Sequence, residues 1–230
     1  MRAAVRLACL ALVAGVVALA PGCKSEPTGA AGKASGQAGS DRDDGDQSLF
    51  DRERQPEVII NALGLGPGKQ VADIGAGTGL LTVHVARAVT PGGRVVATDI
   101  DKAVLEYLHA RMVAAGFDHV VEGRVVAPDD PGLEPGRFDA ILLAQVDHYF
   151  DDRTAWLARA APALKPAGKL AIANRLHHRA AAVAAAEAAG FRLVTEVADV
   201  PGQFVAVFEL AGAPPATPPP PPPPKAKATP

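Results

Sequence analysis

The chain has 230 residues, enough for one domain of ordinary size with extensions at its ends. Its formal net charge is −2, and acidic and basic residues are mixed along it without a basic stripe, so nucleic acid is not an expected partner. Aromatic residues make up only 4% of the sequence, which also disfavours a surface on which nucleotide bases stack.

The first 22 residues have the pattern of an export signal. Arg2 and Arg6 precede an apolar run over residues 7–20, which is short for a membrane span. Small residues then lead to Cys23, and this resembles a bacterial lipoprotein signal, which is cut before the cysteine and lipidated on it. Ala20 departs from the usual leucine, and an uncleaved anchor or ordinary secretory cleavage are the alternatives. We therefore expect an exported lipoprotein, anchored to a membrane only through Cys23, on its periplasmic or cell-surface side.

The segments on either side of the folded domain are low in complexity. Residues 23–47 are rich in Gly, Ala and Ser and end in an acidic patch, so we expect a flexible linker. Residues 213–230 contain a proline run and are expected to form an extended tail. Cys9 would leave with the signal and Cys23 would carry lipid, so no disulfide and no cysteine-based metal site is expected. The histidines lack metal-ligand spacing, so no metal is expected either.

Residues 48–212 alternate between strand and helix patterns. Helices are expected over 54–63, 80–88, 103–115, 153–164 and 180–189, and strands over 70–74, 94–98, within 120–127, 140–143, 169–173, 192–198 and 203–210. This alternation predicts an α/β fold, a mostly parallel, Rossmann-like, seven-stranded sheet with helices on both faces. The turn at 200–202 is too short for a crossover, so the last two strands must form an antiparallel hairpin.

The turn after the first predicted strand carries the strongest signal. In the string Val-Ala-Asp-Ile-Gly-Ala-Gly-Thr-Gly-Leu-Leu over 71–81, an acid ends the strand and three glycines alternate after it. Glycines allow positive φ and a close approach of the backbone to a ligand, and the N-terminus of the next helix favours a negative group. A dinucleotide fingerprint would need a glycine at position 80, where Leu80 stands.

This string resembles motif I of the class I methyltransferases that depend on S-adenosyl-L-methionine (SAM). Strings at 97–100, 137–143 and 163–170 extend the resemblance, which covers about residues 50–210. It is closest to the ubiquinone- and menaquinone-biosynthesis methyltransferases. The resemblance implies SAM as the cofactor. The segment 144–147 lacks the Pro-Pro-aromatic motif of enzymes that methylate nucleobase amino groups, which disfavours that substrate class.

Ligands of open α/β sheets bind outside the carboxyl ends of the strands. The residues expected to bind the cofactor at these ends are Asp73, Gly75, Ala76, Gly77, Gly79, Asp99, Ile100, Asp129 and Asp130. Asp73 is expected to organise the glycine turn through backbone N–H groups.

The carboxyl end of the second strand would hold the nucleoside. The resemblance implies that Asp99 accepts from the ribose hydroxyls. The alternative is that it caps the next helix, a role that Asp101 suits better. Ile100 would pack on the adenine ring. Asp129 or Asp130 would accept from the adenine amino group, unless both only form an Asp-Pro turn.

The predicted activity is methyl transfer to a small-molecule acceptor by in-line displacement. His148 follows the fourth strand and is the candidate general base, with a loop histidine that has no role as the alternative. His177 and His178 lie on the same rim, where a solvated pair is the simpler interpretation. Tyr149 and Phe150 would either wall an apolar acceptor pocket or pack on the next helix.

Export places the domain where SAM is not expected to be abundant. This opens a second hypothesis, a membrane-tethered, non-catalytic module that binds SAM, S-adenosylhomocysteine (SAH) or a related nucleoside. A third hypothesis, an NAD-dependent oxidoreductase, is disfavoured by the glycine spacing and by the terminal hairpin.

Overall fold

The computed structural model describes residues 37–212, and it describes side chains from residue 46 onward. The predicted signal, Cys23, the first part of the linker and the proline-rich tail lie outside the described residues. Within the described part, no helix has both the length and the apolar character needed to cross a membrane.

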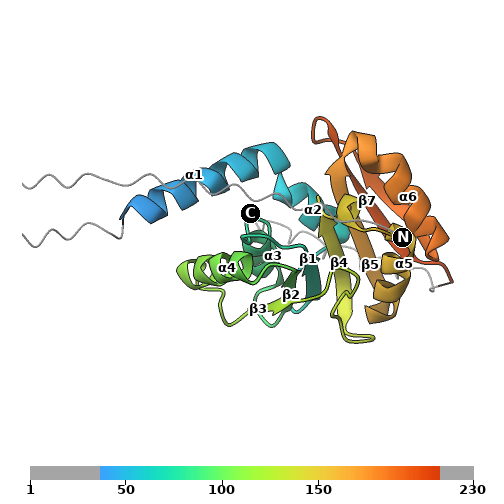
Figure 1. Cartoon of the computed structure of the whole chain (residues 1–230), viewed down its shortest axis with the longest axis horizontal. Helices are drawn as coiled ribbons and strands as arrows, with labels where there is room; N and C mark the ends of the chain where they lie inside the picture. Colours follow the sequence, from blue (N-terminus) through green and yellow to red (C-terminus); the bar gives the residue numbers. More distant parts are fainter. Residues whose placement is uncertain (1–36, 213–230) are drawn as a thin grey trace, which may run out of the picture.

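A seven-stranded sheet forms the centre of the described region (Figure 1). Its strands are β1 (Gln70–Ile74), β2 (Arg94–Asp99), β3 (Val121–Val125), β4 (Phe138–Ala144), β5 (Leu164–Arg175), β6 (Phe191–Val197) and β7 (Gln203–Leu210). Their order is β3-β2-β1-β4-β5-β7-β6, and only β7 runs antiparallel to its neighbours. The predicted Rossmann-like sheet with a C-terminal antiparallel hairpin is confirmed.

Helices cover both faces of this sheet. They are α1 (Gln37–Arg54), α2 (Pro56–Leu63), α3 (Thr82–Val89), α4 (Lys102–Ala115), α5 (Arg153–Ala160) and α6 (Arg179–Ala188), with short 3-10 turns at Asp147–Tyr149, Ala161–Ala163 and Leu176–His178. The side chains of α2 and α3 pack on one face and those of α5 and α6 on the other.

The central strand β4 shows why its sequence is apolar without interruption. Ile141 and Leu143 face the α5 and α6 layer, whereas Ala140 and Leu142 face the α2 and α3 layer. These four side chains are at most 1% exposed. A parallel strand that is buried on both faces has no polar side to show.

The N-terminal part of the fold corrects one prediction. The sequence predicts a flexible linker through residue 47, whereas α1 begins at Gln37. The helix has no marked apolar stripe, so hydrophobic periodicity does not reveal it. Phe50 packs against the core, and polar contacts add to this attachment: the amide of Gln47 donates to the carbonyl of Leu80 at 3.0 Å and accepts from Arg111 at 3.1 Å.

A second correction concerns the passage from α5 to β5. The sequence predicts a helix through Leu164, but α5 ends at Ala160, and a 3-10 turn that contains Pro162 follows. Leu164 already pairs with Phe138 at the start of β5. The register then shifts between Phe138 and Ala140, and residues 165–168 lie within the strand.

Candidate functional site

The glycine turn joins β1 to α3 at the carboxyl edge of the sheet. Gly75, Gly77 and Gly79 have φ values of 64°, 57° and 84°, a region that other residues rarely adopt. A Cβ on Gly75 would lie 2.5 Å from Cγ2 of Val146, so this glycine is needed for packing. A Cβ on Gly77 would meet no atom within 4 Å. Gly77 is therefore the point at which the turn is open to a ligand.

Asp99 ends β2 and contacts the glycine turn. Its Oδ2 accepts from the N–H of Gly77 at 3.0 Å, and its Oδ1 accepts from the N–H of Asp101 at 3.1 Å. Each carboxylate oxygen keeps a second lone pair for another donor. The helix cap belongs to Asp101, whose Oδ1 accepts from the N–H of Ala103 at 2.8 Å. Asp99 thus remains available to a ligand with paired hydroxyls.

Asp73 lies at the end of β1 and is only 2% exposed. The sequence predicts that it organises the glycine turn through backbone N–H groups. Its hydrogen bond in the structure instead comes from the hydroxyl of Thr82, 2.7 Å from Oδ2, which links β1 to the first turn of α3. Burial raises the pKa of Asp73 to about 6, and the bond from Thr82 opposes this rise.

Replacing Asp73 by asparagine is expected to flatten the pH dependence of stability below neutrality. The folded chain holds the Asp73 proton up to about pH 6, against 3.8 for the free side chain. The folded state therefore binds more protons in this window, and the free energy of unfolding falls as pH rises from about 4 to 6. A shift of about two units corresponds to about 3 kcal/mol. Asparagine still accepts from Thr82 and has no charge to bury.

Urea denaturation at pH 4 and pH 7 measures this effect. The free energy of unfolding of the Asp73→Asn protein, relative to wild type, should rise by about 3 kcal/mol between the two values. Equal pH dependence in the two proteins would contradict the assignment.

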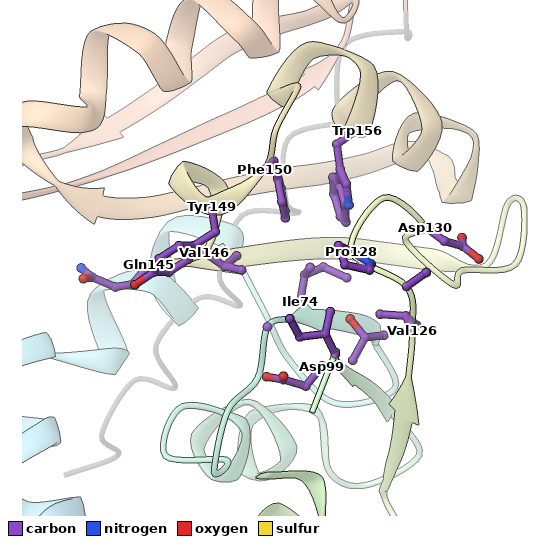
Figure 2. Close-up of a pocket in the computed structure, with 14 residues that line it drawn as sticks. Ile74, Asp99, Val126, Pro128, Asp130, Gln145, Val146, Tyr149, Phe150 and Trp156 are labelled. Atoms are coloured by element: carbon purple, nitrogen blue, oxygen red, sulfur yellow. The ribbon is translucent and has the colours of Figure 1, made fainter. Parts of the chain in front are cut away.

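A mostly apolar cavity of about 290 Å³ opens beside Asp99 (Figure 2). Ile74, Ile100 and Val126 line it from the strand ends. Phe150 and Trp156 line it from the loop after β4 and from α5, and their rings stack with centroids 4.3 Å apart. Such a cavity, with a carboxylate at its side, suits a flat base attached to a sugar.

Asp129 and Asp130 follow β3 and lie in a turn, which is the alternative role that the sequence predicts for them. Oδ1 of Asp130 accepts from the N–H of Gly132 at 2.9 Å, and Figure 2 shows its carboxylate directed away from the other labelled side chains. Asp129 does not line the cavity, and its carbonyl accepts from Nε of Arg159 at 2.8 Å. Asp130 lines the cavity and Asp129 does not, so only Asp130 of the two acids lies beside the place where a base would lie.

A second cavity of about 310 Å³ lies on the other side of the glycine turn. Phe50 and Arg54 of α1 form one wall of it, and Ala76 and Gly77 lie on another. The two cavities adjoin each other, because Gly75 and Gln145 line both.

Gln145 occupies an unusual position at this junction. It follows β4, next to β1, where the strand order reverses, and its φ is 59°. Residues other than glycine rarely adopt a positive φ, and those that do often lie at functional sites. The site therefore lies at the switch point that the fold predicts for ligands.

His148 lies on the outer rim and lines neither cavity. Its Nδ1 is 3.0 Å from Nδ2 of Asn174, which also donates to the buried Asp147 at 2.6 Å. Its ring stacks on that of His178, with centroids 4.5 Å apart. Desolvation and the positive charges of His177 and His148 lower the pKa of His178. The cavity geometry does not support His148 as the general base.

Metal chemistry has no candidate ligand set here. Across residues 46–212, no group of three His, Cys, Asp or Glu side chains is arranged to hold a metal ion.

Comparison with known proteins identifies the domain. Residues 72–170 match the family model described as a methyltransferase domain, and this span contains the glycine turn, Asp99 and Gln145. The chain carries a class I SAM-dependent methyltransferase domain. The SAM-dependent methyltransferase of Aquifex aeolicus shares this fold, with a TM-score of 0.63 at 22% identity, over 66% of this chain and 88% of that one.

Curated relatives match part of this methyltransferase domain. A ubiquinone/menaquinone biosynthesis C-methyltransferase from Teredinibacter turnerae is 33% identical over 116 residues, 50% of this chain and 47% of that protein. Nocamycin O-methyltransferase from Saccharothrix syringae is 31% identical over 106 residues, 46% of this chain and 38% of that protein. The matches thus span less than half the length of these two relatives.

The residues of the methyltransferase domain fit SAM. The apolar cavity would hold adenine beside Ile100, and Asp99 would accept from the ribose hydroxyls. The open face of Gly77 leads into the second cavity, which has room for the methionine part. The predicted cofactor is therefore compatible with the site in both shape and donor set.

Proposed function

We propose that the domain transfers the methyl group of SAM to a small-molecule acceptor. The observation that carries the proposal is the pair of adjoining cavities that share Gly75 and Gln145. The nucleoside would occupy the cavity beside Asp99. The methionine part would follow the glycine turn, and the acceptor would enter the second cavity from the side of α1.

SAM supplies a methyl group on a positively charged sulfur, which is a good leaving group. The nucleophilic atom of the acceptor forms a bond to the methyl carbon while the carbon–sulfur bond breaks. The electron pair of that bond stays on sulfur and gives SAH, and a proton on the acceptor leaves to solvent. The contribution of the protein is to align the reactants and exclude water. Phe50, Ile59 and Leu81 supply apolar walls for this purpose.

The names of the relatives support the acceptor class. One is named as a C-methyltransferase of ubiquinone and menaquinone biosynthesis and the other as a nocamycin O-methyltransferase. A small-molecule acceptor is common to both, whereas the atom that receives the methyl group differs between them.

Calorimetry of the full chain with SAM, SAH and NAD tests which cofactor binds. An assay of SAH production with a panel of quinols, phenols and aliphatic acids then tests methyl transfer. Binding of SAM with SAH production is the expected result. Binding of SAH without turnover on any acceptor would instead indicate the tethered, non-catalytic module. Binding of NAD alone would indicate an oxidoreductase.

We also propose that the protein is exported and anchored through Cys23. The support is the sequence pattern of residues 1–23. Cys23→Ser is expected to leave an unlipidated precursor, because the serine cannot accept the thioether-linked lipid. The protein should then move from the detergent phase to the aqueous phase on partitioning. Cys9→Ser is the matched control, because Cys9 leaves with the signal and its loss should change nothing. A wild-type protein that is aqueous and keeps residues 1–22 would refute the proposal.

A further inference from the structure

A polar groove adjoins the second cavity on the side away from Asp99. It has a volume of about 510 Å³ and is lined by residues at the end of α1, at the end of β5 and in the β6–β7 turn. Arg54 and Gln203 line both the groove and the second cavity. The groove and the second cavity therefore adjoin each other at Arg54 and Gln203.

The groove is rich in positive charge. Arg52, Arg54 and Arg175 line it, and Glu53 is its one acidic lining residue. Among the residues that the structure describes, none of these three arginines pairs with a carboxylate. Arginines elsewhere do so, as Arg179 does with Glu196 at 2.5 Å. The groove thus holds an excess of positive charge that no described acid of the chain neutralises.

Hydrogen bonds fix the floor of the groove. Nη1 of Arg54 donates to Oε1 of Gln203 at 2.9 Å, and Nε2 of Gln203 donates to the carbonyl of Glu53 at 2.9 Å. Gln145, at the junction of the cavities, lies 3.4 Å from the same Gln203 oxygen. This network holds Arg54 in place with one donor, and its remaining N–H groups have no acceptor among the described residues and can serve a ligand.

We propose that the methyl acceptor carries a carboxylate or a phosphate, which the arginine groove binds while the apolar part of the acceptor lies in the second cavity. This inference rests on the proposed methyl transfer and specifies its substrate class. A guanidinium presents paired N–H donors that match the oxygens of either anion. The anionic group is a recognition element and not the attacking atom, because the groove adjoins the cavity and does not contain the glycine turn.

The carboxylate of SAM itself is the competing anion. It could reach Arg54, which lines the same cavity as the glycine turn. Arg52 and Arg175 line the groove and not that cavity. Substitution of these two residues therefore separates binding of the acceptor from binding of the cofactor.

Fluorine NMR titrations of the full chain, with and without saturating SAH, test the proposal. The probes are 4-fluorobenzoate and 4-fluorobenzamide, which have the same shape and differ in charge, with phenyl phosphate as a competitor. Wild type should bind the acid at least about tenfold more tightly than the amide, and this preference should shrink with added salt. Stronger competition by phenyl phosphate than by unlabelled benzoate would identify phosphate as the preferred group.

The Arg52→Gln/Arg175→Gln double variant should lose most of the preference for the acid and keep the affinity of wild type for SAH. Arg87→Gln is the matched control, because Arg87 is an exposed arginine on α3 that lines neither the groove nor the second cavity. Thermal unfolding verifies that each variant is folded.

Equal affinity of wild type for acid and amide would overturn the proposal, as would a preference that survives in the double variant. Loss of SAH affinity in parallel with acid affinity would also overturn it and would assign the arginines to the cofactor. A wild-type protein that prefers the acid but does not bind SAH would refute the proposed function alone.

Discussion

Asp99→Ala is expected to weaken the binding of SAM and SAH by roughly tenfold to a few hundredfold. The net loss of one charge-assisted hydrogen bond to the ribose hydroxyls costs about 1.5–3 kcal/mol, and 1.4 kcal/mol is about tenfold in affinity. The substitution also removes the acceptor for the N–H of Gly77, which holds the glycine turn against β2. Asp99→Asn keeps one acceptor oxygen and should fall between wild type and alanine. Calorimetry of the folded variants measures each affinity.

A 2′,3′-dideoxy analogue of SAH isolates the ribose contact. It should bind wild type poorly, and the loss caused by Asp99→Ala should largely disappear with it, since both changes remove the same interaction. Asp101→Ala is the matched control, because this neighbouring acid only caps α4. It should cost about 1 kcal/mol of stability and leave both affinities unchanged. The assignment of Asp99 fails if the two variants behave alike.

Gly77→Val is expected to reduce SAM affinity by more than about a hundredfold, or roughly 3 kcal/mol. The new side chain would project into space where the protein has no atom within 4 Å, and this is the space that the cofactor needs. Valine is also strained at a φ of 57°. Thermal unfolding measures this strain, and calorimetry measures the affinity.

Gly64→Val separates strain from obstruction. Gly64 ends α2 with a φ of 65°, it also has no atom within 4 Å of a Cβ, and it lines neither cavity. The two variants should lose similar amounts of stability, and only Gly77→Val should lose the cofactor. Normal SAM affinity in folded Gly77→Val protein would rule out the glycine turn as the binding surface.

The sheet and the glycine turn could be predicted because their signals are local. The apolar run of β4 and the alternating glycines after β1 each act over a few residues. The assignment of the α4 cap to Asp101 follows equally from the preference of short acidic side chains for N-cap positions. In these segments the sequence pattern and the tertiary structure impose the same conformation.

Other parts of the site depend on contacts between distant segments. Trp156 lines the nucleoside cavity only because α5 packs over the end of β4, and no spacing in the sequence indicates this. Thr82 bonds to Asp73 across the turn, and Arg54 reaches Gln203 across 149 positions of the chain. The topology correctly predicts that His148 lies at the carboxyl edge of the sheet. The direction of its side chain at that edge depends on the contact with Asn174. Residue type and position along the chain do not determine such directions.

The position of β7 has a consequence for how the domain is made. β7 is the last of the described strands along the chain, yet it lies between β5 and β6, and it is the strand with which β6 pairs. Its segment 204–208 is buried throughout. A nascent chain that ends before residue 203 therefore has an open edge on β5 and no strand with which β6 can pair. Translation must pass Leu210 before the sheet can close. A premature stop codon near the end of the domain would remove the strand that joins β6 to the rest of the sheet.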